Sequence, residues 1–247
     1  MQAADPPDVD ATTLAAPSLV GIQRLSAVDS VRARIALAVD LGLLAPGERI
    51  PPVSEVAAAL DVSEASVRRA LEALTQGGVL VRLRGRSGGT LVADVPTRES
   101  VLEVDAYRSE KEHVHQLIDQ RIVLDCGVAA LAARFATKAQ VTRLSRLVDR
   151  MEVASTWAEF HRTDERFHVG VAEAARLPGF SNSYCAVLHD LYRFYLPYPV
   201  EHLRESNREH RELVEAIVEG DVATATDVAR RHVETLHRTM FVGLLDA

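Results

Sequence analysis

Apolar residues recur every three or four positions through most of the chain, the spacing that places them on one face of an α-helix. Near the start, this spacing covers 26–41, where Gly42 ends it. Two shorter helical patterns follow over 53–60 and 64–75, joined by a tight turn. The pattern then changes to runs of apolar and β-branched residues, which predict two strands over 79–83 and 90–93. We therefore expect three helices followed by a β-hairpin.

From about residue 101 the helical spacing returns and continues almost to the end of the chain. Breaks fall at Pro178-Gly179, at Pro197 and Pro199, and at Gly220. We expect helices over 101–109, 112–136, 138–153, 157–176, 181–195, 202–219 and 222–243. The predicted fold class is mainly α, with an N-terminal winged helix-turn-helix that carries a small β-hairpin wing and a C-terminal all-α helical bundle.

Composition changes along the chain in a way that divides it into segments. The first residues are rich in Ala, Pro, Asp and Thr without periodicity. The predicted segments are a disordered tail over 1–21, a DNA-binding domain over 22–93, a linker over 94–100 and a helical domain over 101–243. The whole chain has a net charge of −7, but the DNA-binding segment by itself has a charge of +2. The acidic total therefore does not exclude nucleic acid as a partner.

Other features exclude membrane and secreted classes of protein. No stretch approaches the ~18 apolar residues that a membrane span requires. The N-terminus has no basic segment before Arg24, so it lacks the pattern of a secretory signal. Cys126 and Cys185 are the only two cysteines, too few for a disulfide framework. We expect a cytoplasmic protein with no membrane partner.

Polar and basic residues lie where a winged helix-turn-helix contacts double-stranded DNA. Hydroxyl, acidic and guanidinium groups at the start of the third helix can meet phosphates and base edges. In the predicted wing, glycines let the backbone approach DNA closely and arginines add charge. The candidate DNA-binding residues are Ser63, Glu64, Ser66, Arg68, Arg69, Arg84, Gly85 and Arg86.

The DNA-binding segment resembles the GntR family of bacterial transcription regulators over about residues 24–93. The resemblance rests on Pro-Gly-Glu-Arg-Ile-Pro at 46–51, Glu-Val-Ala at 55–57, Val-Arg-Arg-Ala-Leu at 67–71 and Arg-Gly-Arg-Ser-Gly-Gly at 84–89. It implies a homodimer on a two-fold symmetric operator. Ser54, Glu64 and Arg69 depart from the residues usual in the family, so we expect an unusual operator sequence.

One carboxylate and three imidazoles are spaced so that they can meet inside the helical domain. Asp164 and His168 are four residues apart, on one side of one helix. His210 and His232 belong to two later helices. Such a set can bind a divalent metal ion in a bundle core and leave coordination positions open.

The helical segment resembles the FadR C-terminal type of effector domain (FCD) over about residues 101–240. The resemblance rests on Asp-x-x-Phe-His at 164–168, on Glu-His at 209–210 with the residues around it, and on His232. It implies that Asp164, His168, His210 and His232 bind a divalent metal, with zinc expected first and nickel or manganese as alternatives. Arg121 is a candidate partner for an effector carboxylate, or else forms a salt bridge.

Together these features predict a ligand-responsive transcription regulator and not an enzyme. We expect a repressor that binds operator DNA as a homodimer and releases it when a small organic acid binds near the metal. Two alternatives stay open: a metal-dependent enzyme domain fused to a DNA-binding module, and a sensor of the metal itself. An acyl-CoA-responsive regulator is a weaker alternative, because the ligand set matches the metal-binding branch of these domains.

Overall fold

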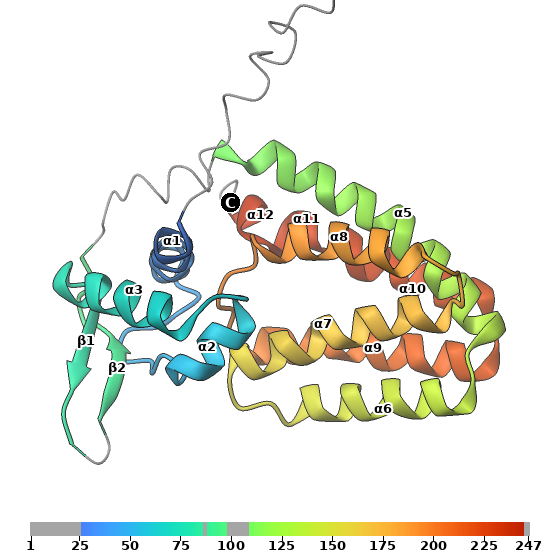
Figure 1. Ribbon diagram of the computed structural model, residues 1–247, viewed down its shortest axis with the longest axis horizontal. Helices are drawn as coiled ribbons and strands as arrows, with labels where there is room; N and C mark the ends of the chain where they lie inside the picture. The colour runs from blue at the N-terminus through green and yellow to red at the C-terminus, as the bar shows by residue number, and fades with distance from the viewer. Residues whose placement is uncertain (1–25, 86–87, 98–108, 245–247) are drawn as a thin grey trace, which may run out of the picture.

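The computed structural model describes residues 26–85, 88–97 and 109–244 (Figure 1). The predicted tail over 1–21, almost all of the predicted helix over 101–109, part of the predicted linker and Arg86 lie outside these residues. The described chain is mainly helical and has one two-stranded sheet. The predicted fold class is confirmed.

The N-terminal part is a winged helix-turn-helix. Its elements are α1 (Ala27–Asp40), α2 (Val53–Ala59), α3 (Glu64–Gln76), β1 (Leu80–Leu83) and β2 (Gly89–Val92). Ser26 and Ser63 cap α1 and α3, each with its hydroxyl accepting a hydrogen bond from a backbone N–H of the first turn. The two strands are antiparallel, with Leu80 opposite Val92, and they form the hairpin that projects from one end of the molecule in Figure 1.

The C-terminal part is a bundle of helices. They are α5 (Lys111–Phe135), α6 (Lys138–Glu152), α7 (Trp157–Ala174), α8 (Phe180–Tyr192), α9 (Val200–Glu219), α10 (Val222–Glu234), α11 (Leu236–Thr239) and α12 (Phe241–Leu244). Helix α10 packs along α5 and α9, and α7 packs against α5, α6 and α8. The long helices run side by side, so side chains from several of them can meet in the interior (Figure 1).

The single helix predicted over 222–243 is wrong, because the structure has three shorter helices there. The backbone is extended at Met240, with ψ of 164°, which breaks the helical path. Met240, Phe241 and Val242 are all buried, at 1% exposure or less. A continuous helix would present three consecutive residues to different sides. Burial of all three apolar side chains explains why the chain turns here.

One apolar cluster continues from the winged domain into the helical domain. Leu43 and Leu44 of the winged domain belong to the same cluster as Leu196, Met240 and Phe241 of the helical domain. Helix α2 also packs against α7. The two domains therefore share part of their hydrophobic core. A change in the packing of these apolar side chains would change the position of one domain relative to the other.

Candidate metal centre and DNA-binding surface

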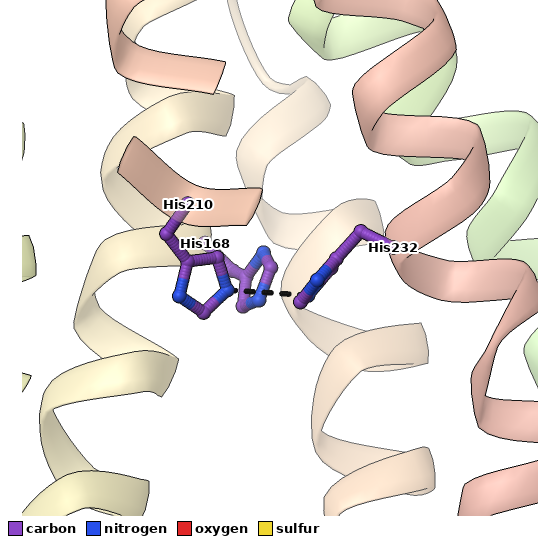
Figure 2. A group of neighbouring side chains, drawn as sticks. All are labelled: His168, His210 and His232. Atoms are coloured by element: carbon purple, nitrogen blue, oxygen red, sulfur yellow. Dashed lines mark hydrogen bonds between the residues drawn. The ribbon is translucent and has the colours of Figure 1, made fainter. Parts of the chain in front are cut away.

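Three histidines from three helices come together inside the helical bundle. Figure 2 shows the rings of His168 on α7, His210 on α9 and His232 on α10 pointing toward one another. All three side chains are at least nine-tenths buried. One nitrogen of each ring lies within 4.8 Å of one nitrogen of each of the others. This cluster could bind a metal ion.

Local helix geometry directs these rings inward. On α9 the buried positions Asn207, His210, Val214 and Ile217 recur every three or four residues, so His210 shares the core-facing side of the helix. On α7, Asp164 is one turn before His168 and both are buried. The same spacing that builds the apolar core therefore places the polar cluster within it.

The donor atoms are close enough to share one ion. The Nε2 atoms of His210 and His232 are 3.2 Å apart. The Oδ1 atom of Asp164 lies 3.4 Å from Nε2 of His210 and 3.7 Å from Nε2 of His168. Zinc lies about 2.0–2.2 Å from such ligands, so pairs of donors about 3–4 Å apart can contact the same ion. The structure thus brings together all four residues proposed as ligands from the sequence.

Polar neighbours contact the Nδ1 side of two of the rings and so orient their Nε2 atoms toward the centre of the cluster. The Nδ1 atom of His232 is 2.9 Å from the Glu209 carboxylate, and Nδ1 of His210 is 3.4 Å from Oδ1 of Asn207. The hydroxyl of Tyr192 donates to the Asp164 carboxylate. Partners of this kind hold a ligating imidazole with its other nitrogen facing the metal. Glu209, Asn207 and Tyr192 were not predicted, and only the adjacency of Glu209 to His210 in the sequence could have indicated one of them.

Burial keeps the imidazoles of His168 and His210 in the form that binds metals. It lowers the pKa of His168 and of His210 well below the usual value, and the nearby Arg121 guanidinium and His232 lower these pKa values further. Both rings are therefore neutral at neutral pH and keep a lone pair available. Burial raises the pKa of Asp164, while the hydrogen bond from Tyr192 opposes this shift.

A cavity of about 630 Å³ opens beside the cluster. Asp164, His232 and Glu209 lie on its wall, so a small molecule in the cavity could reach a metal held by the histidines. His161 and His202 also line it, although no motif in the sequence assigned a function to either residue. Burial, followed by the charge of Arg34, lowers the pKa of His161 to about 3, so this ring is neutral too.

The position of Arg121 differs from that of the cavity residues. Its guanidinium is 1% exposed and forms an ion pair with Asp125, one turn further along α5, at 2.9 Å. It also lies 3.3 Å from Nδ1 of His168 and 3.4 Å from the hydroxyl of Tyr195. Neither Arg121 nor Asp125 lines the cavity. Arg121 therefore lies behind the histidine cluster, and its role in binding an effector stays a prediction.

Arg34 of α1 connects the winged domain to this region. Its side chain is 3% exposed and donates hydrogen bonds to the backbone carbonyls of Tyr195, at 2.6 Å, and Tyr192, at 3.0 Å. Those two tyrosines contact Arg121 and Asp164 through their hydroxyls. A chain of hydrogen bonds thus runs from the DNA-binding domain to the metal-ligand candidates.

The residues predicted to contact DNA lie on the surface of the winged domain. Ser63, Glu64, Arg68 and Arg69 are exposed at the start of α3, and Ser66 is half-buried; Arg84 and Gly85 are exposed in the wing. Two interactions on this surface occupy polar groups that could otherwise contact DNA. The hydroxyls of Ser63 and Ser66 are 2.9 Å apart at the helix cap, and Arg68 forms an ion pair with Glu64. Within the described residues, neither Arg69 nor Arg84 forms a side-chain hydrogen bond or an ion pair.

No helix within the described residues is both long and apolar enough to cross a bilayer.

Comparison with known proteins gives matches to both parts of the chain. Residues 27–92 match the profile of the bacterial regulatory proteins of the gntR family, and residues 116–235 match the FCD domain. RmpR of Mycobacterium gastri, a candidate HTH-type transcriptional regulator, is 29% identical over 87% of this chain and 80% of its own length. A candidate L-lactate dehydrogenase operon regulatory protein of Escherichia coli K12 is 28% identical over 88% and 87%. The solved structure of Streptococcus agalactiae GntR matches with a TM-score of 0.44, at 22% identity over 86% of this chain and 100% of that one.

A winged helix-turn-helix joined to a helical domain with a buried polar centre defines a class of DNA-binding regulators. Within that class, the chain belongs to the GntR family, with an N-terminal GntR helix-turn-helix and a C-terminal FCD domain, the arrangement of the FadR subfamily. Proteins of this family are transcription regulators and not enzymes, as the sequence predicted.

Proposed function

We propose that this regulator represses transcription by binding operator DNA as a homodimer, and that a small organic acid relieves repression by binding beside a metal ion. The observation that carries the proposal is the convergence of three histidine nitrogens and the Asp164 carboxylate beside a cavity that Asp164 and His232 line. Repression relieved by ligand is the mode that the family resemblance favours. Two-fold symmetry of a dimer would match a palindromic operator.

Asp164, His168, His210 and His232 would hold the metal ion. Three nitrogens and one carboxylate oxygen suit zinc best, and they also suit nickel or manganese. When bound, the ion supplies positive charge and open coordination positions for an effector carboxylate. The chain's own residues orient the site: Glu209 fixes the ring of His232 and Tyr192 fixes the Asp164 carboxylate.

The link to DNA binding runs through the segment after α8. Arg34 bonds the backbone of Tyr192 and Tyr195, whose hydroxyls contact the centre. A ligand that moves these tyrosines would change the hydrogen bonds that hold α1. Because the recognition helix α3 packs against α1, such a change would alter the position of the winged domain and its operator affinity.

The effector response is tested by measuring operator affinity. An operator is first selected from a random pool of duplexes, and its dissociation constant is measured with metal-loaded protein as the acid is added. One relative is named for an L-lactate dehydrogenase operon, so lactate is the first acid to add. We expect a coupling of about 1–3 kcal/mol, a 5- to 150-fold loss of operator affinity.

Protein stripped with a chelator should lose that response while still binding operator DNA. A change of operator affinity on adding metal alone would instead support a sensor of the metal. Operator affinity that no acid alters, in metal-loaded protein, would contradict the proposed function.

For DNA recognition we propose residues at the start of α3 and in the wing segment: Ser63, Glu64, Ser66, Arg68, Arg69, Arg84 and Gly85, together with Arg86, which lies outside the described residues and is proposed from the sequence alone. Glu64 forms an ion pair with Arg68. This ion pair occupies part of the capacity of the Glu64 carboxylate to accept a hydrogen bond from a base. Arg69 and Arg84 carry the charge available to phosphates.

Replacing Arg84 with Ala should weaken binding to operator and to unrelated duplexes by similar factors. Loss of one phosphate contact also lowers the slope of log affinity against log salt by about 1. Fluorescence anisotropy between low and moderate salt measures both quantities. The matched control is Arg150→Ala, which removes an exposed arginine from α6 in the helical domain. An unchanged salt slope for Arg84→Ala would exclude this residue from the DNA interface.

A further inference from the structure

The cavity beside the histidine cluster is much larger than a small acid. Its volume is about 630 Å³, within the range of about 300–1,000 Å³ that pockets for drug-sized ligands span. Each water occupies about 30 Å³ in the liquid, so a space of this size corresponds to about twenty waters. A three-carbon acid bound at the metal would displace only a few of them. Most of the cavity therefore lies beyond the reach of such a ligand.

The cavity wall includes a group of large apolar side chains. Trp157, Phe160, Leu196, Leu236 and Met240 all line it. Displacing water from such a surface favours binding of an apolar group. The chemistry of the wall therefore indicates a ligand with an apolar portion as well as a carboxylate.

Among the residues that the structure describes, Leu43 is the one on the cavity wall that comes from the winged domain. It follows α1 in the chain and belongs to the apolar cluster that also contains Leu196 and Met240. Leu44, its neighbour, is 1% exposed and does not line the cavity. A ligand that fills the space would thus contact both domains at once.

We propose that the effector is a carboxylic acid with an extended apolar tail, and that this tail contacts Leu43 of the DNA-binding domain. The inference rests on the proposed function, because the carboxylate is placed at the metal centre. The tail then forms part of the contact between the domains. Binding affinity and the position of the winged domain are coupled directly, through Leu43, in addition to the hydrogen bonds of Arg34.

An effector with a second acidic group in place of the apolar tail is the alternative, because Arg208 and Arg238 also lie on the cavity wall. Glu205 and Glu209 share that wall and offset their charge. The large apolar side chains on the wall, Trp157 and Phe160 among them, favour the tail. A diacid is therefore one arm of the test.

The test measures dissociation constants of metal-loaded, full-length protein by calorimetry for four acids of increasing length: lactate, 2-hydroxybutanoate, 2-hydroxyhexanoate and 2-hydroxyoctanoate. Burial of each methylene should tighten binding about threefold to fourfold, so the longest acid should bind at least about a hundredfold tighter than lactate. Affinity that does not depend on tail length, or tighter binding of 2-hydroxyglutarate than of 2-hydroxyhexanoate, would overturn the inference and leave the proposed function standing.

Variants then test the contact with the winged domain. We expect Leu43→Ala to weaken binding of 2-hydroxyoctanoate about fivefold or more, because contact with the tail is lost, and so to reduce the gain in affinity from lactate to 2-hydroxyoctanoate. Leu44→Ala is the matched control, since it truncates a buried leucine of the same segment away from the cavity. Equal losses in the two variants would contradict a contact at Leu43. The length series on wild-type protein does not depend on whether either variant folds.

One further compound separates the two proposals. If 2-hydroxyoctanamide binds as tightly as 2-hydroxyoctanoate, the tail site stands and the carboxylate contact of the proposed function fails. If no compound of the series binds metal-loaded protein, the inference is overturned, and the metal content decides separately on the centre itself.

Discussion

The His210→Ala variant should bind a divalent metal ion more than about a hundredfold more weakly than the wild-type chain. Loss of an outer partner of a metal ligand costs about 10–100-fold, and loss of a ligand costs more. His210 is 1% exposed, and its Nε2 atom lies 3.2 Å from Nε2 of His232 and 3.4 Å from Oδ1 of Asp164. Competition against a chromogenic chelator measures the affinity.

Thermal unfolding gives a second measure of the same change. A ligand at a hundred times its dissociation constant stabilises the native state by about 2.7 kcal/mol, which raises the Tm of a chain of this size by about 5 °C or more. We expect zinc to raise the Tm of wild type in this way and to leave that of His210→Ala unchanged. His189→Ala is the matched control, because His189 is an exposed histidine paired with Glu165 outside the cluster. Metal affinity that is equal in both variants would contradict the assignment of His210.

Replacing Arg121 with Met should destabilise the folded chain by about 3–5 kcal/mol. The substitution keeps much of the side-chain volume but leaves the Asp125 carboxylate buried without its ion-pair partner, and an uncompensated buried charge has this cost. The expected fall in Tm is about 10 °C. The control is Arg143→Met, which breaks an exposed ion pair with Glu173 and should cost less than about 1 kcal/mol.

A double variant distinguishes the two roles considered for Arg121. If Arg121 is there for the ion pair, Arg121→Met with Asp125→Leu should regain most of the lost stability, because both buried charges are gone. If Arg121 also binds the effector, acid binding should be lost in Arg121→Met and should stay lost in the double variant. Urea unfolding and calorimetry with lactate separate these outcomes.

Helix spacing made much of the fold predictable, and it failed where tertiary burial decided the path of the chain. Apolar periodicity and the glycine at 220 located the long helices of the bundle. The same periodicity predicted one helix through Met240. A run of only a few apolar residues fits a helix and a tight turn equally well, so the pattern could not distinguish them. Which of them forms depends on whether Met240, Phe241 and Val242 are buried together.

The candidate site was partly visible in the sequence for a similar reason. The i, i+4 spacing of Asp164 and His168 places both on one helix face, and family resemblance supplied His210 and His232. The outer partner Tyr192 lies 28 residues from Asp164 along the chain, so no local pattern connects them. The same holds for Arg34, whose partners are about 160 residues away. Long-range hydrogen bonds such as these follow from packing, which a single sequence does not reveal.

The most direct test of the account is the metal-to-protein ratio of the wild-type chain, measured by elemental analysis after purification without chelator. The proposed centre predicts about one divalent ion per chain, zinc first among them. No bound metal, together with no uptake when zinc, nickel or manganese is added, would contradict the metal-centred mechanism.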